Sequence, residues 1–172
     1  MISDLPAVPG VVWRVGPQPG LIGDVAALHG RYHAREWAFP PMFEVKVARE
    51  LGAMLARFDA QRDLVIGGER DGRFIASITL DASDPELRAG EGHLRWFIVD
   101  TGLQGHGVGR GLLDATLGFA RKSGLTSVYL TTFRGLDQAA ALYCRAGFVV
   151  TDEKPGETWG RVVIEQRLEL RF

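Results

Sequence analysis

Glycine occupies every second position from Gly105 to Gly111, within the segment QGHGVGRG. An apolar stretch, GHLRWFIVD, precedes this segment, and a sequence with helical spacing follows it. Glycine permits positive φ angles and lets the backbone approach a ligand closely. Free backbone N–H groups at the start of a helix bind phosphate, and the helix dipole favours the negative charge. The segment is therefore a candidate phosphate-binding turn.

Two well-known phosphate-binding motifs do not fit this spacing. A P-loop ends in Gly-Lys-Ser/Thr, whereas Gly109 is followed by Arg110 and Gly111. The dinucleotide fingerprint G-x-G-x-x-G fails as well, because its last position, counted from Gly105, falls on Arg110. The remaining pattern is Q-x-x-G-x-G between a strand and a helix. On spacing alone, a flexible loop with a glycine-assisted helix start is an alternative to a phosphate site.

The elements that must position this turn follow from hydrophobic spacing and turn residues, in the order β-α-α-β-β-β-α-β-α-β-β. The clearest hairpin has Asp71-Gly72 at its turn, since a type I′ turn needs positive φ at both central residues. Strand–helix–strand units predict local parallel pairing, and the hairpins predict antiparallel neighbours. The fold class is thus α+β, a single mixed sheet with helices packed against it.

Apolar spacing also predicts which helix faces are buried. In the first helix the expected positions are Val25, Leu28, Tyr32 and Trp37. In the second they are Phe43, Val47, Leu51, Met54, Leu55 and Phe58. In the helix after the glycine turn they are Leu112, Leu113, Thr116, Leu117 and Ala120, and Gly124 ends that helix. Asp137 is the expected N-cap of the last helix, and Gly147 its end.

Composition limits the class of protein. The chain of 172 residues has a formal net charge of −1 and no run of like charges, which argues against nucleic-acid binding. Cys144 is the only cysteine, so neither an internal disulfide nor a cysteine-based metal site is expected. The N-terminal segment lacks the pattern of a secretion signal, and no stretch is long enough to span a membrane. We expect one cytoplasmic domain over residues 1–172, with no metal.

Two segments resemble the GNAT family of N-acetyltransferases. FIVDTGLQGHGVGRGLL carries the family's Q/R-x-x-G-x-G/A turn, and ALYCRAGF is similar to its A-x-x-L-Y-x-x-x-G-F signature. LRWFIV, TFRGLD and WGRVVIEQRLEL are also similar to acetyltransferase domains fused to MarR-type regulators. The resemblance covers most of the chain. It implies a GNAT-like fold of about seven strands and about four helices, with strands four and five splayed apart.

The resemblance also implies acetyl-CoA as co-substrate, because the glycine turn binds its pyrophosphate in that family. The coenzyme-binding residues it implies are Phe97, Ile98, Val99, Gln104, Gly105, His106, Gly107, Val108, Gly109 and Arg110. The backbone N–H of Ile98 or Val99 is the implied hydrogen-bond donor to the thioester carbonyl. Many family members carry an asparagine at the position of Leu136, so the coenzyme contact it makes is missing or moved here.

Catalysis requires a proton for the leaving thiolate and a base for the amine. Tyr143 matches the family's proton donor, although a tyrosine here is also a common packing residue. His93 lies where some members carry a glutamate base, and a histidine suits that task. Glu36 is a second catalytic candidate and Glu91 another rival. A water chain without a single base is a further alternative.

The acceptor is expected near the first helix. Tyr32 and Trp37 offer aromatic surface for a cationic amine, and Tyr32 shares a helix face with Glu36. Arg95 is a basic residue inside an apolar strand, so it either pairs with a buried carboxylate or holds an anionic group of the substrate. Trp159 lies in the last hairpin, which in this family often borders the cleft or a dimer interface.

The sequence therefore predicts an acetyl-CoA-dependent N-acetyltransferase that acts on a primary amine of a small molecule or protein. The alternatives are a non-catalytic acyl-CoA-binding sensor and a regulatory partner-binding module. No nucleic acid or membrane is expected as a partner, and a homodimer is compatible with the resemblance.

Overall fold

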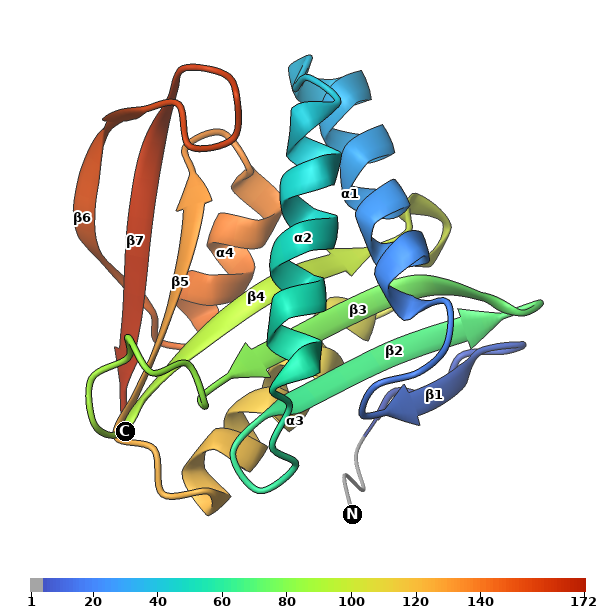
Figure 1. Cartoon of the computed structure of the whole chain (residues 1–172), viewed down its shortest axis with the longest axis horizontal. Helices are drawn as coiled ribbons and strands as arrows, with labels where there is room; N and C mark the ends of the chain where they lie inside the picture. The colour runs from blue at the N-terminus through green and yellow to red at the C-terminus, as the bar shows by residue number, and fades with distance from the viewer. Residues whose placement is uncertain (1–4) are drawn as a thin grey trace.

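The computed structural model describes residues 5–172, which form one seven-stranded sheet with helices on both faces (Figure 1). The strands are β1 (Val12–Val15), β2 (Leu64–Arg70), β3 (Arg73–Asp81), β4 (Glu91–Val99), β5 (Ser127–Phe133), β6 (Val149–Gly156) and β7 (Val163–Arg171). The helices are α1 (Leu21–Trp37), α2 (Met42–Ala56), α3 (Val108–Lys122) and α4 (Asp137–Arg145), with a short 3-10 turn, η1 (Thr101–Leu103). The predicted order of elements and the α+β class are confirmed.

The sheet has the strand order β1-β2-β3-β4-β5-β7-β6, and β4 and β5 are its parallel pair. Their pairing is short, because it covers only Glu91–His93 opposite Ser127–Tyr129. β4 then continues to Val99 and β5 to Phe133, so the two strands diverge beyond His93 and Tyr129 (Figure 1). We call the space between the diverging strands the fork. It agrees with the splay expected at strands four and five.

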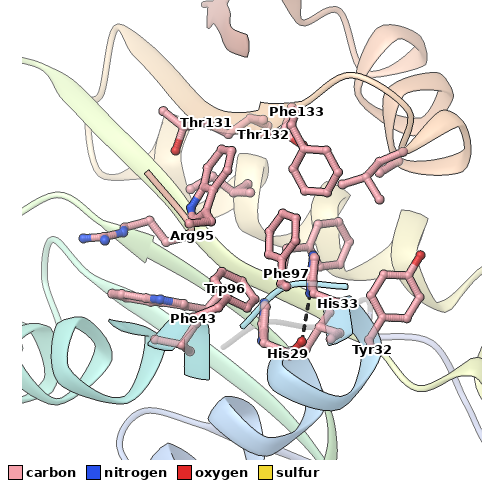
Figure 2. Close-up of a pocket in the computed structure, with 18 of the residues that line it drawn as sticks. His29, Tyr32, His33, Phe43, Arg95, Trp96, Phe97, Thr131, Thr132 and Phe133 are labelled. Carbon is pink, nitrogen blue, oxygen red and sulfur yellow. Dashed lines mark hydrogen bonds between the residues drawn. The ribbon is translucent and has the colours of Figure 1, made fainter. Parts of the chain in front are cut away.

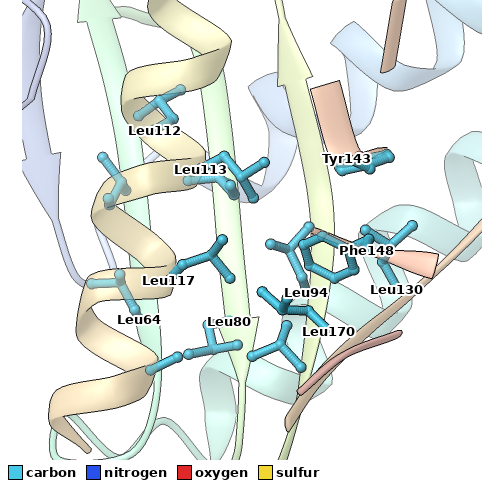
Figure 3. Close-up of a cluster of buried hydrophobic side chains, with 14 of the residues drawn as sticks. Leu64, Leu80, Leu94, Leu112, Leu113, Leu117, Leu130, Tyr143, Phe148 and Leu170 are labelled. Atoms are coloured by element: carbon cyan, nitrogen blue, oxygen red, sulfur yellow. The ribbon is translucent and has the colours of Figure 1, made fainter. Parts of the chain in front are cut away.

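Helices α3 and α4 cover one face of the sheet. Every residue predicted for the buried face of α3 is buried. Leu112, Leu113 and Leu117 pack over leucines and isoleucines of β2 and β3, while Tyr143 and Phe148 extend the same core toward β5 (Figure 3). The apolar side chains of α3 face the sheet because β2 and β3 supply a continuous hydrophobic surface there, as apolar spacing predicted.

Helices α1 and α2 cover the opposite face. The buried stripe of α2 is Phe43, Val47, Leu51 and Met54, as predicted, with Leu55 and Phe58 half-buried. For α1 the prediction was right at Val25 and wrong at its three other positions. Its buried residues are Leu21, Val25, Ala26, His29 and His33, whereas Leu28, Tyr32 and Trp37 are half-buried. The stripe continues at spacings of four through two histidines, which a hydrophobicity pattern counts as polar.

Two predicted turns can be compared with the structure. Asp71 and Gly72 have φ angles of 51° and 75°, which fits the type I′ hairpin expected there. The expected N-cap at Asp137 was wrong, because Leu136 occupies that position and no side chain caps α4. Asp137 lies in the first turn instead, where its negative charge still interacts favourably with the helix dipole.

Candidate active site

The fork leaves one edge of β4 without a strand partner. Backbone N–H groups point alternately to the two edges of a strand. The N–H of Asp100 donates to the carbonyl of Ile75 on β3 at 2.8 Å, so the N–H and C=O of Val99 face the fork. Gln104 supports this orientation, since its Nε2 donates to the Val99 carbonyl at 3.3 Å. Of the two amides proposed as donors, that of Val99 is therefore the one turned toward the fork.

A β-bulge shapes β4 beside the fork. Trp96 has a φ of 44°, a left-handed conformation that bulky residues rarely adopt. Pairing with β3 shifts register between Ser77 and Thr79, so β4 carries one extra residue. Trp96 packs into the core beneath α1 and α2, and Phe97 packs on the α3 side. The bulge thus keeps Arg95 and Trp96 on the same side of the sheet.

The glycine turn precedes α3 and is open to solvent. Gly105 and Gly107 have φ angles of 81° and 73°, and Gly107 is the N-cap of α3 without any side-chain cap. A Cβ at either position would meet no atom within 4 Å. Among residues 5–172, we find no backbone acceptor for the N–H groups of 105–110. The turn therefore offers free donors and room for an anion.

A cavity of about 470 Å³ extends from the fork to the space beneath α1 and α2 (Figure 2). Side chains from α1, α2, β4 and β5 converge on it. Eight of the residues predicted for the site line its wall, namely Tyr32, His93, Arg95, Phe97, Ile98, Val99, Gln104 and Tyr143. Trp159 also lines it. Glu36, Trp37 and residues 105–110 are not part of this wall.

Tyr143 lies on α4 and is 7% exposed. Its ring packs near Phe97 and Phe148, with centroid distances of 6.3 and 5.8 Å. Burial raises the pKa of the Tyr143 phenol well above its ordinary value of 10.0. The hydroxyl is therefore protonated throughout the neutral range and available as a proton donor at the cavity wall.

His93 lies at the base of the fork, where its ring stacks on that of Tyr129. Arg167 lies over the tyrosine ring, and its guanidinium binds Glu91 at 2.6 Å. Burial lowers the pKa of His93 well below 6.5, and the positive charges of Arg95 and Arg167 lower it further. His93 is thus neutral, and it is held by packing on its tyrosine neighbour.

Arg95 pairs with a carboxylate, which is one of the two alternatives that the sequence left open. Its guanidinium binds Glu50 on α2 and lies 3.9 Å from Asp81. Asp81 is fully buried and is held by two bonds from Arg57, at 2.9 and 2.6 Å. Glu50 also binds Lys46. In Figure 2 the Arg95 guanidinium points away from the histidines of α1.

The remaining acidic candidates are engaged elsewhere. Glu36 is exposed and pairs with its neighbour Arg35 at 2.6 Å, so the structure does not bring it to the cavity. Glu91 is buried in its pair with Arg167. The carboxylates on the cavity wall that the structure describes are Glu50, which is paired, and Asp137, which is exposed at the start of α4.

Two histidines of α1 line the cavity and were missed by the sequence analysis. His29 and His33 are 6% and 9% exposed. The Nδ1 of His29 bonds the Val25 carbonyl at 3.0 Å, and the Nδ1 of His33 bonds the His29 carbonyl at 2.9 Å, the second of which is drawn in Figure 2. Burial lowers the pKa of His29 to about 4 and also lowers that of His33. The signal that could have found them is that they continue the series Leu21 and Val25 at intervals of four residues.

Aromatic rings surround these histidines. His33 lies 4.8 Å from Phe43, 5.4 Å from Phe39 and 6.0 Å from Phe133, centroid to centroid. Tyr32 meets the His33 ring edge-on at 5.0 Å. We call this part of the cavity the aromatic compartment, formed by His29, Tyr32, His33, Phe39, Phe43 and Phe133. Trp37 packs on the Phe133 ring at 4.9 Å without lining the cavity.

Two further properties concern residues 5–172 as a whole. No helix in this range is long and apolar enough to cross a membrane. Within the same residues, no group of three or more His, Cys, Asp or Glu side chains is arranged to hold a metal ion.

Comparisons with known proteins agree with this architecture. A search among curated proteins gives no significant match. Solved structures share the fold. An acetyltransferase of the GNAT family from Streptococcus pneumoniae has a TM-score of 0.69 and 15% identity, covering 94% of this chain and 99% of that one. The yncA protein of Salmonella typhimurium, solved with its cofactor acetyl-CoA, has a TM-score of 0.67 and 20% identity, covering 94% of both chains.

A third structure, the ribosomal-protein-S18-alanine N-acetyltransferase of Escherichia coli, has a TM-score of 0.65 and 18% identity, covering 93% of this chain and 94% of that one. At such identities the likeness shows the fold alone. The family itself is shown by sequence, because the model of the acetyltransferase (GNAT) family matches residues 28–148, more than half of the chain. The chain, with its glycine turn before α3 and its fork beside β4, belongs to the GNAT family of acetyltransferases.

Proposed function

We propose that this protein is an acetyl-CoA-dependent N-acetyltransferase that acetylates a primary amine of a small molecule or a protein. The observation that carries the proposal is one continuous cavity, which joins the open edge of β4 to Tyr143 and to the space beneath α1 and α2. A donor and an acceptor that enter from its two ends would meet beside β4. Residues 1–172 form a single such domain in this proposal.

The residues present fit acetyl-CoA, which supplies an acetyl group activated as a thioester. Backbone N–H groups of 105–110, with the start of α3, would hold its diphosphate. The open edge of β4 at Phe97, Ile98 and Val99 would hold its pantetheine arm. The N–H of Val99 would donate to the thioester carbonyl, and losing such a donor costs about 10²–10³ in rate.

Tyr143 is the proposed proton donor to the departing sulfur. Its phenol is protonated at neutral pH, and its place on the cavity wall beside Phe97 supports this role. For the base, His93 reaches the cavity wall but is stacked at the base of the fork, whereas Glu36 lies outside the wall. The geometry therefore gives Tyr143 stronger support than either proposed base.

An acyl-CoA sensor without catalysis is the second candidate, because Glu36 lies outside the cavity wall, Glu91 is paired with Arg167, and His93 is stacked on Tyr129 at the base of the fork. A closer relation to the acetyltransferase domains fused to MarR-type regulators is proposed only from the similar segments LRWFIV, TFRGLD and WGRVVIEQRLEL. A homodimer and a cytoplasmic location are likewise sequence-based proposals.

The test separates turnover from binding. Purified protein is mixed with acetyl-CoA and a panel of amines, and release of the free coenzyme A thiol is followed. Isothermal titration with acetyl-CoA is run in parallel. Amine-dependent thiol release supports the proposal. Acetyl-CoA binding without turnover on any amine would favour the sensor. The absence of acetyl-CoA binding would exclude both the N-acetyltransferase and the sensor.

A further inference from the structure

We propose that the aromatic compartment binds an acceptor amine that carries an aromatic group, and that His33 Nε2 takes the proton from its nitrogen. This inference rests on the proposed N-acetyltransferase function and assigns its acceptor class and its base.

The hydrogen bonds of α1 fix the histidine tautomers. A backbone carbonyl only accepts hydrogen bonds, so the ring nitrogen that bonds it must carry the proton. Nδ1 of His29 and of His33 each bond such a carbonyl, at 3.0 and 2.9 Å. Each Nε2 therefore carries the lone pair. Among residues 5–172, no hydrogen-bond partner of the His33 Nε2 is found, and the ring lines the cavity.

The surroundings of His33 keep it neutral. The side chains that face it are His29 and Tyr32 from α1, Phe39 from the loop between α1 and α2, Phe43 from α2 and Phe133 from β5. None of these is a carboxylic acid or a permanent cation, and burial lowers the pKa of His29 to about 4, so His29 is neutral at neutral pH. Burial also lowers the pKa of His33. A neutral imidazole is ready to accept a proton.

Charge favours an acceptor that presents a neutral amine. The charged side chains on the cavity wall are Lys46 and Arg95, which both bind Glu50, and Asp137, which lies at the exposed start of α4. None of the six residues of the compartment is acidic. A polycationic acceptor would find no counter-ion there, so its desolvation would be uncompensated. A single amine that enters in its neutral form, and loses a proton to His33 only as the C–N bond forms, avoids that cost.

The ring geometry favours an aromatic body on the acceptor. The contacts within the compartment are mainly edge-to-face, as between Phe39 and Phe43 at 89° and between Tyr32 and His33 at 83°. Aromatic pairs in such arrangements gain energy beyond area burial. Trp159 adds a further ring beside Phe133 at 5.6 Å. A flat ring would complete this cluster better than a polar peptide backbone.

The proposed step balances in atoms and electrons. As the amine nitrogen bonds the carbonyl carbon, its N–H bond breaks and His33 Nε2 binds the proton. As the C–S bond breaks, Tyr143 gives its proton to the sulfur. The imidazolium and the phenolate then exchange a proton through solvent, and both residues return to their starting forms. Glu91 is paired with Arg167 and Glu36 lies outside the cavity wall, while His93 lines the wall at the base of the fork and not in the aromatic compartment.

Substrate preference is tested with three amines at equal concentration: 2-phenylethylamine, spermidine and a peptide with an N-terminal alanine. Thiol release should be at least tenfold faster, in kcat/KM, with 2-phenylethylamine. Higher kcat/KM with spermidine or the peptide would overturn the inference and leave the proposed function intact. No turnover with any amine, when acetyl-CoA still binds, would overturn both.

The role of His33 is tested with His33→Asn, whose amide nitrogen replaces Nδ1 and leaves nothing at Nε2. A general base contributes about 10²–10⁴ in rate, so kcat should fall about 100-fold with unchanged acetyl-CoA affinity. His33→Gln is a second variant in case the first does not fold. Arg31→Ala, exposed on the same helix, is the control and should keep wild-type kcat.

The pH profile distinguishes a base from a packing residue. In the wild type, kcat should fall as the pH decreases through the His33 pKa, below 6.5. In His33→Asn this acid limb should disappear from the residual activity. Wild-type kcat, or an unchanged acid limb, in His33→Asn and His33→Gln would overturn the assignment.

Discussion

His93 and Tyr129 stack with ring centroids 4.1 Å apart and an interplanar angle of 17°, on the last paired residues of β4 and β5. Arg167 covers the other side of the tyrosine ring, 3.6 Å from its centroid. These three side chains therefore form a stack at the point where the sheet opens. His93 also lines the cavity, so the stack lies where the fork and the cavity begin.

His93→Phe should keep this stack and remove the titratable nitrogen. We expect turnover within about threefold of wild type and an unchanged melting temperature, because a ring–ring contact is worth about 0.5–1.5 kcal/mol in either form. His93→Ala removes the contact and should lower the melting temperature. A loss of turnover of about 100-fold in His93→Phe, with acetyl-CoA binding intact, would show instead that His93 is the base.

Gly107→Val should abolish acetyl-CoA binding without unfolding the protein. Gly107 holds φ at 73°, which a β-branched residue adopts only with strain, so the N–H groups at the start of α3 would be displaced. Isothermal titration should show a dissociation constant raised more than tenfold, with an unchanged circular dichroism spectrum.

Gly118, within α3, is the control position for the Gly107→Val variant. Gly118 has no atom within 4 Å of an added Cβ and no positive φ. Gly118→Ala should raise the free energy of unfolding by about 0.5–1 kcal/mol and leave acetyl-CoA binding unchanged. Wild-type affinity in Gly107→Val would remove the glycine turn from the binding site.

Tyr143→Phe should lower kcat about 100-fold while acetyl-CoA binds as tightly as before. Only the hydroxyl is lost, so the packing on Phe97 and Phe148 is retained. Because burial raises the pKa of Tyr143 well above 10, the wild-type activity should show no basic limb from this residue below about pH 10. A Tyr143→Phe variant with wild-type kcat would exclude the proton-donor role.

Stability should decrease in mild acid because of His29. Burial lowers its pKa to about 4 in the folded state, whereas the unfolded value is about 6.5. Between these values the unfolded chain binds a proton that the folded chain does not. The free energy of unfolding should therefore fall by about 3 kcal/mol from pH 6.5 to pH 4.

The contribution of His29 is isolated by comparing melting temperatures at pH 7 and pH 5. His29→Asn keeps an amide donor for the Val25 carbonyl and should melt with a smaller pH difference than wild type. His106→Asn, at an exposed histidine, should keep the wild-type difference. Equal pH differences in all three proteins would contradict the assignment.

The sequence by itself determined the order of the elements, the α+β class and the glycine turn before α3. These follow from local rules. Apolar periodicity separates helices from strands, and positive φ at Asp71-Gly72 and Gly107 depends on a few neighbouring residues. The family signature is equally local, since it lies within short contiguous segments.

Tertiary structure alone decided which side chains meet in the cavity. A hydrophobicity pattern counts His29 and His33 as polar residues that face solvent. Both are buried, because aromatic rings from α2 and β5 cover them. Arg95 is paired because α2 places Glu50 beside it. Glu36, four residues after Tyr32, pairs with Arg35 outside the cavity wall. Burial and pairing depend on contacts between elements far apart in the chain, and no local pattern contains them.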